Sequence, residues 1–155
     1  MTTPDPTPIP GAADWLAQYN ARTAAEAALR ATNKDIVFDA LTAAGIATIV
    51  ITFDGYGDSG QIEDIQVHGP DGVDLSQIRI RLTVLDWRTE TPVEREASLH
   101  ECVEDLAYGY LKQTHDGWEN NEGGYGEFTF DVASRTISLD YNERYGAVET
   151  YQHQF

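Results

Sequence analysis

Basic residues are scarce in this chain of 155 residues. Lysine and arginine together number 10, against 26 aspartate and glutamate residues, so the formal net charge at pH 7 is −16. Binding to nucleic acid or to an anionic membrane needs positive charge that neutralises phosphate groups. The composition therefore argues against direct contact with nucleic acid or membrane. It favours a basic protein surface as partner, although excess negative charge also keeps a protein soluble.

Cysteine and long apolar runs are also missing. The single cysteine, Cys102, cannot form an intramolecular disulfide, which fits a reducing compartment. No apolar run approaches the ~18 residues that span a bilayer. Residues 1–11 hold four of the six prolines and lack the basic and apolar regions of a secretory signal. We therefore expect a cytoplasmic protein with a flexible proline-rich arm at 1–11 and a single domain at 12–155.

The acidic residues are concentrated in two stretches. Between Asp35 and Ile78 there are eight acidic residues and no base. Between Glu96 and Asp131 there are nine acidic residues and one base, Lys112. A basic partner would meet these two stretches first.

Two helices are predicted near the N-terminus. The alanine-rich residues 13–32 favour helix, and the capping-box spacing of Thr23 and Glu26 predicts a break just before Thr23. A second helix is predicted from Asn33, as N-cap, to Ala44.

The third predicted helix has the best sequence signal. Thr91 is the expected N-cap, Pro92 the first helical residue and Glu94 the partner in a capping box, and Gly117 follows the end of the helix. Its apolar stripe is predicted to face the core and contains Val93, Ala97, Leu99, Cys102, Val103, Leu106, Tyr110 and Leu111.

The remaining segments predict antiparallel strands. Residues 46–54 are β-branched and apolar on both faces, as in a central strand, whereas 77–87 alternate as in a half-exposed strand. The other strands are expected at 61–69, in a hairpin that turns at Ala133–Ser134, and at the edge in 147–155. The fold class is α+β, in the order ααβββαββ(β), with one antiparallel sheet of about five or six strands and helices packed on one face.

Two glycine-rich acidic segments stand out: FDGYGDSGQIEDI (53–65) and GWENNEGGYGEF (117–128). The first cannot be a phosphate-binding P-loop, since it lacks the lysine and the following helix. It also fails the EF-hand pattern, because Tyr56 occupies the third position. An irregular divalent-cation site stays open as a weak alternative, with Asp54, Asp58 and Glu119 as candidate ligands.

These segments are candidate places for contact with a partner, since tryptophan and tyrosine commonly anchor protein interfaces. The alternative is purely structural: glycines with positive φ in a strand connection, and a tryptophan packed as a plug over the core. The candidate partner-binding residues are Tyr56, Asp58, Glu63, Asp64, Trp118, Glu119, Glu122 and Tyr125.

No catalytic constellation emerges from the sequence. Glu96, His100 and Glu104 share one face of the third predicted helix but have a glutamate where a zinc helix needs its second histidine. Cys102 has acidic neighbours, which raise the pKa of a thiol and oppose a nucleophilic thiolate. Arg144 is expected to pair with a neighbouring acid of the motif DYNERY or to clamp an anion. The other histidines, His68, His115 and His153, have no ligand-spaced partners in sequence.

The blocks FDGYGDSGQIED and GWENNEGGYGEFTFDVASRTISLDYNERY together resemble a family of small acidic bacterial and phage proteins that is catalogued only as a domain of unknown function. The resemblance covers residues from about 33 to 155. It implies a bacterial source, often linked with mobile elements, and a shared design for both glycine-rich segments. It implies no activity.

We therefore expect a non-enzymatic interaction protein without a cofactor, whose acidic surface binds a basic partner. In its most concrete form it inhibits a nucleic-acid-binding protein by mimicking nucleic acid. The alternative is a divalent-metal-binding enzyme or sensor that uses carboxylates of both glycine-rich segments, which requires that those segments converge in space.

Overall fold

The computed structural model describes residues 12–56, 59–86, 88–119, 123–144 and 148–155. The predicted arm at 1–11 and the acids Asp58 and Glu122 lie outside these residues. In chain order the elements are α1 (Ala12–Ala43), β1 (Thr48–Tyr56), β2 (Ser59–His68), a short 3-10 helix (Leu75–Gln77), β3 (Arg79–Leu85), β4 (Pro92–Ser98), α2 (Leu99–Thr114), β5 (Gly124–Asp131), β6 (Thr136–Arg144) and β7 (Val148–Gln154).

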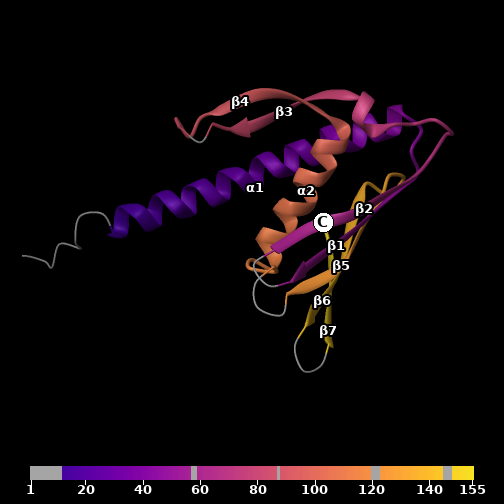
Figure 1. Cartoon of the computed structure of the whole chain (residues 1–155). Coiled ribbons are helices and arrows are strands. Elements are labelled where there is room, and N and C mark those ends of the chain that lie inside the picture. Colours follow the sequence, from indigo (N-terminus) through magenta and orange to yellow (C-terminus); the bar gives the residue numbers. More distant parts are fainter. Residues whose placement is uncertain (1–11, 57–58, 87, 120–122, 145–147) are drawn as a thin grey trace, which may run out of the picture.

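The α+β class is confirmed, and the strands form two antiparallel sheets. The larger has five strands in the order β2-β1-β5-β6-β7, and the smaller pairs β3 with β4. Both helices lie to the same side of the five-stranded sheet (Figure 1). The strand predicted at 77–87 therefore exists as β3, but it belongs to the smaller sheet, because its partner β4 is a segment predicted to be helical.

The N-terminal helix is continuous, so the predicted break just before Thr23 is wrong. The Thr23 hydroxyl donates to the Tyr19 carbonyl at 2.9 Å, and Glu26 accepts from Arg22 at 3.1 Å. Both side chains of the supposed capping box thus make contacts one turn back along the helix, which an uninterrupted helix allows. The N-terminal half of α1 extends beyond the rest of the domain (Figure 1).

The second helix begins seven residues later than predicted. Ser98, and not Thr91, is the N-cap of α2, and its hydroxyl accepts from the Glu101 amide at 3.1 Å. Residues Ser98 to Glu101 repeat the capping-box spacing, so the sequence contains two such signals close together. The signal at Thr91 does not start a helix, because residues 92–98 alternate in polarity and pair with β3 as strand β4.

The core lies between the sheet and the helices. Its largest fully buried side chains come from the inner face of β1, β5 and β6, from α1 and from α2: Phe38, Phe53, Phe128, Phe130, Leu41, Ile49, Ile51, Leu99, Leu111, Ile137, Leu139 and Val37. Phe38 of α1 meets Phe130 of β5 at a ring-centroid distance of 6.0 Å. Each such side chain stabilises the fold by roughly 1.5–3 kcal/mol through removal from water.

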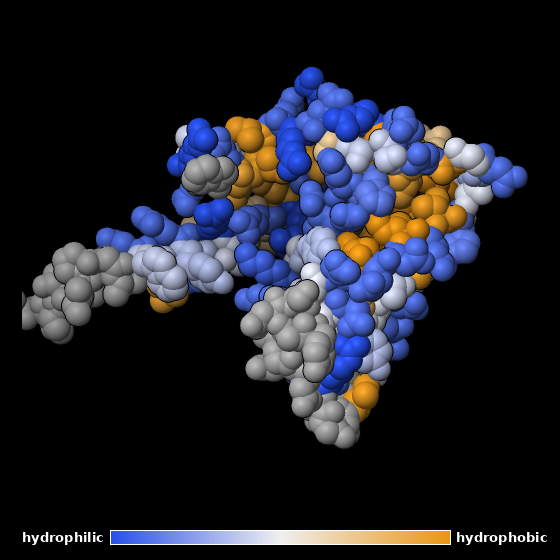
Figure 2. All heavy atoms as spheres, viewed as in Figure 1, coloured by the Kyte–Doolittle hydropathy of each residue, from blue (hydrophilic) through white to orange (hydrophobic). Residues whose placement is uncertain are grey.

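The small sheet is attached to α1 by a buried asparagine. Asn33, predicted as an N-cap, lies inside α1, where its Nδ2 donates to the Thr83 carbonyl at 2.9 Å and its Oδ1 accepts from the Thr83 amide at 3.2 Å. One side chain thus satisfies both backbone groups on the unpaired edge of β3. Figure 2 shows hydrophobic side chains gathered between the β3–β4 hairpin and the helices. Asn33 and Thr83 line a cavity of about 170 Å³ between α1, β3 and α2.

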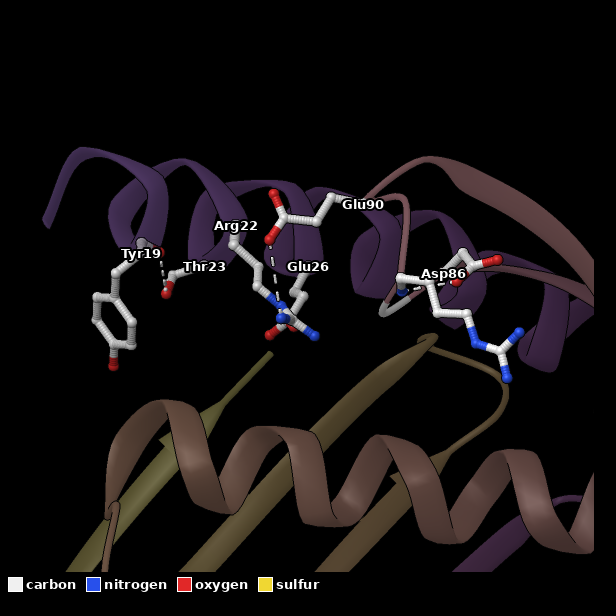
Figure 3. Close-up of polar contacts among 7 residues, drawn as sticks. Tyr19, Arg22, Thr23, Glu26, Asp86 and Glu90 are labelled. Atoms are coloured by element: carbon white, nitrogen blue, oxygen red, sulfur yellow. Dashed lines mark hydrogen bonds and ion pairs between the residues drawn. The ribbon is translucent and has the colours of Figure 1, made fainter. Parts of the chain in front are cut away.

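The β3–β4 turn makes a second, weaker contact with α1. Figure 3 shows Arg22 of α1 reaching toward Glu90, whose carboxylate lies 3.9 Å from the guanidinium. Glu90 has a φ of 55°, and its amide donates to the Asp86 carbonyl at 2.7 Å. The exposed pair adds little free energy, so Asn33 is the main polar attachment of this hairpin to α1.

Candidate protein-binding surface

The two glycine-rich acidic segments meet at one end of the five-stranded sheet. β1 and β5 are neighbours, and their ladder sets Asp54 opposite Tyr125. A Cβ atom on Gly55 would lie 2.7 Å from the Trp118 ring, and one on Gly60 would lie 2.6 Å from it. Glycine is required at both positions by this close approach. Neither Gly55 nor Gly60 has the positive φ that the sequence predicted for this connection, whereas Gly117 and Gly123 of the second segment do. Gly57 lies outside the described residues.

Trp118 is the plug that holds this end together. It is 9% exposed and meets Phe53 edge-on, with ring centroids 5.5 Å apart. Tyr108 of α2 lies beside it at 6.4 Å and accepts a hydrogen bond from the Ile62 amide of β2 through its hydroxyl at 2.9 Å. Trp118 is therefore packed against the core, as the structural interpretation of this segment predicted.

Arg144 ties the two segments together from the other side. Its Nη1 lies 2.8 Å from Oδ1 of Asp54 and donates to the Gly55 carbonyl at 3.0 Å. The guanidinium also covers the Tyr125 ring at 4.5 Å, a cation–π contact. The expected ion pair exists, but with Asp54 of β1 rather than with the sequence neighbours Asp140 or Glu143.

Of the carboxylates in the alternative metal hypothesis, the structure describes Asp54 and Glu119 and does not place them together in a metal-binding group. Asp54 faces Arg144, Glu119 lies against Gly60, and Asp58 is not among the described residues. Within the part of the chain that the structure describes, no three or more histidine, cysteine, aspartate or glutamate side chains form a group able to hold a metal ion.

The face of the five-stranded sheet away from the helices is open and polar. The strand registers line up one transverse row of five residues across all five strands, from β2 to β7. The row consists of Asp64, Thr52, Glu127, Asp140 and Gln152. Every member is at least partly exposed. Because strands lie about 4.8 Å apart, the three acids span roughly 14 Å.

Two of these acids are direct cross-strand neighbours. Glu127 of β5 is the register partner of Asp140 of β6, and like charges in that position destabilise a sheet. Within their bounds the five strands contain one base, Arg144, which contacts Asp54 at the sheet end. Nothing in these strands compensates the Glu127–Asp140 pair.

The described candidate partner-binding residues lie in the transverse row, in the bulge beside it, at the sheet end and at the end of β1. Asp64 lies in the transverse row, and Glu63 is the extra residue of a bulge, since Thr52 pairs with Asp64 and Phe53 with Ile62. At the sheet end are Trp118, Glu119 and the half-buried Tyr125. Tyr56 is the last residue of β1, while Asp58 and Glu122 lie outside the described residues.

Sequence reasoning considered Glu127 only as part of the second glycine-rich segment and did not place Asp140 on this surface. In β5, Phe128 and Phe130 are fully buried and the intervening alternation leaves Glu127 exposed. Only the register between β5 and β6 places Asp140 beside it, and register depends on the turn geometry.

The residues considered for catalysis or metal binding are either buried in the core or paired with a charged neighbour. Cys102 is fully buried, and burial, with Asp105 and Glu101 adding to it, raises the pKa of its thiol to about 11. His100 contacts Glu104 at 2.7 Å on an exposed face of α2. Glu96 is not on that helix, contrary to prediction, and instead pairs with Arg79 across the small sheet at 3.3 Å.

The structure thus defines an α+β domain with one sheet face covered by helices and one face open, polar and acidic. The chain belongs to the family described as "Family of unknown function (DUF6878)", whose profile matches residues 29–155. No curated protein matches the chain. Among the described residues, none of the helices is both long and apolar enough to cross a membrane.

Proposed function

We propose that this protein is a non-enzymatic binding protein whose open sheet face engages a basic surface on a partner protein. The observation that carries the proposal is the row of Asp64, Glu127 and Asp140 on that face. Cross-strand repulsion between the last two lowers the stability of the free protein, and a lysine or arginine side chain of a partner would relieve it. The most concrete partner is a nucleic-acid-binding protein, whose phosphate-binding groove this face would occupy.

The local charge distribution supports a partner of this chemistry. The five strands contain eight acidic residues and one base. Fields of one sign steer oppositely charged partners and raise association rates. The acids are Asp54, Glu63, Asp64, Glu127, Asp131, Asp140, Glu143 and Glu149.

A matched pair of variants tests the proposal. In one, Asp64→Asn, Glu127→Gln and Asp140→Asn neutralise the row; in the other, Asp14→Asn, Asp71→Asn and Glu101→Gln remove the same charge from residues outside the five strands. Each is used as bait in extracts of the native cell beside the unaltered chain. We expect basic proteins that the unaltered chain and the second variant retain and that the first variant loses.

The retained protein is then purified and its affinity measured in solution. The affinity should fall steeply as salt rises from about 50 to 500 mM, since screening weakens contacts between charged surfaces. Nucleic acid that this partner binds should compete with the acidic protein. The proposal is overturned if the affinity is indifferent to salt, or if both triple variants lose binding equally.

A further inference from the structure

Two histidines that are far apart in sequence meet on the covered side of the five-stranded sheet. His115 follows the last turn of α2, and His153 lies on β7. Their Nε2 atoms are 2.9 Å apart, and the ring planes are inclined by 73°. Both side chains are half-buried, so the pair is reachable from solvent. Neither histidine has a role in the acidic open face.

Aromatic neighbours fix the His115 ring. It stacks on Tyr141 of β6, with centroids 3.8 Å apart and planes 7° apart, and Tyr151 lies at 5.3 Å. The ring of His153 is nearly parallel to that of Phe155, at 6.1 Å. Side chains held in this way lose little further freedom when they bind a ligand, which favours affinity.

The electrostatic surroundings favour a cation that neutral imidazoles can hold. His115 is the C-cap of the 16-residue helix α2, where the helix dipole presents partial negative charge. Glu143 and Glu119 act on the adjoining Tyr141 and, after burial, help raise its pKa to about 12.

We propose that His115 and His153 form a binding site for a divalent transition-metal ion, with Zn²⁺ as the reference case. Zinc binds imidazole nitrogen at about 2.05 Å in tetrahedral geometry, which sets two ligand nitrogens roughly 3.3 Å apart. To reach that separation the pair must open by about 0.4 Å. The ring that donates this hydrogen bond must also move its proton to Nδ1, and both rings must turn until the two Nε2 lone pairs face the ion. The described residues supply no third side chain to such a group, so water completes the coordination and leaves positions open.

Zinc binding is measured on the full chain without a polyhistidine tag, after removal of metal with a chelator. Zn²⁺ is titrated at pH 7.5 against a chromogenic competitor, and imidazole nitrogen shifts are followed by NMR. We expect one equivalent to bind, with shifts in the Nε2 resonances of His115 and His153. His153→Phe should weaken binding at least tenfold. His115→Phe, which keeps an aromatic ring against Tyr141, should do the same.

The two remaining histidines provide the controls. His68→Phe and His100→Phe should leave the affinity within about twofold, since neither belongs to the His115–His153 pair and His100 instead contacts Glu104 on α2. Folding of each variant is checked by its unfolding transition without metal. The proposal is overturned by the absence of saturable binding below about 100 μM Zn²⁺, by unchanged binding in His153→Phe, or by loss that follows His100 instead.

Discussion

The two sheets of this protein treat charge in opposite ways. In the small β3–β4 sheet, acids and arginines alternate across the strands: Arg79 lies 3.3 Å from Glu96, and Arg81 lies 3.3 Å from Glu94. On the open face of the large sheet, Glu127 faces Asp140, and the one base within the five strands is held at the sheet end. Both sheets are antiparallel and solvent-facing on one side, so strand architecture does not explain the difference.

Negative charge is thus compensated by arginines on the small sheet and left uncompensated on the open face of the large sheet. Cross-strand pairs of opposite charge each favour the folded sheet by a few tenths of a kcal/mol, and like pairs oppose it by similar amounts. The small sheet is attached to α1 through Asn33 and is self-sufficient in charge. The large sheet keeps an uncompensated row on its open face, where a partner with basic side chains would supply the missing charge.

The largest expected effect concerns what supports the acidic face. Trp118→Ala should lower the free energy of unfolding by about 3–5 kcal/mol, since it removes a buried ring from against Phe53 and beneath Gly55 and Gly60. Val93→Ala in the small sheet, a residue 38% exposed, should change it by less than about 1 kcal/mol. Urea denaturation of both variants gives the comparison. Similar losses in the two would show that Trp118 does not hold the sheet end.

A pH effect should also distinguish the sheets. The pKa of His115 is lowered in the folded protein, so the unfolded chain binds the proton more tightly. The associated stability is therefore present above the ordinary histidine pKa and is lost as the pH falls through that pKa and the lowered one. The groups around the ring are Tyr141, Tyr151 and His153, with Glu119 and Glu143 acting on Tyr141.

The measurement is hydrogen exchange with a chelator present, from pH 7.5 downward. After correction for intrinsic rates, protection of β7 should fall at higher pH than protection of β3 and β4. Acid also reduces the net negative charge, which acts on the whole molecule. His115→Phe isolates the local effect and should flatten the pH dependence in β7. Unchanged dependence in this variant would show that another group is responsible.

Local sequence signals predicted most of the strands well, with β4 as the exception. Alternation and β-branched residues found β1, β3 and the β5–β6 hairpin, and the weak pattern at 147–155 is the edge strand β7. The helix boundaries were less predictable, because capping residues have other uses. Thr23 and Glu26 bond within a continuous helix, and Glu94 pairs with Arg81 across a sheet.

The candidate surface was predictable only in part, since it depends on contacts between distant residues. The sequence indicated both glycine-rich segments and Asp64 as candidates. It did not reveal that Gly55 and Gly60 must be glycine because the Trp118 ring packs directly against them. It placed His115 and His153 apart, because 38 residues separate them and only the packing of α2 on β6 and β7 joins them. Arg144 likewise reaches Asp54 across β5, which no local pattern reveals.

A double-mutant cycle compares ion pairs from the two regions. Asp54→Asn with Arg144→Gln should give a coupling of about 1 kcal/mol, since these side chains are 44% and 30% exposed and the guanidinium also covers Tyr125. Arg81→Gln with Glu94→Gln should give about 0.3 kcal/mol, because both side chains are more than 70% exposed. Equal couplings would mean that Arg144 does not tie the two glycine-rich segments together.

The smallest expected effect is also the sharpest, because its sign should differ between the sheets. Glu127→Gln removes repulsion from Asp140 and should raise the free energy of unfolding by about 0.3–0.5 kcal/mol, whereas Glu94→Gln removes an attraction to Arg81 and should leave it unchanged or lower it slightly. Both are measured by urea denaturation at low ionic strength, and about 0.5 M salt should shrink both changes. A stabilised Glu127→Gln protein that binds its basic partner less well would show that this charge is maintained at the expense of stability. A destabilised one would mean that Glu127 has a structural role on the sheet, and the contrast between the two sheets would then lose its main support.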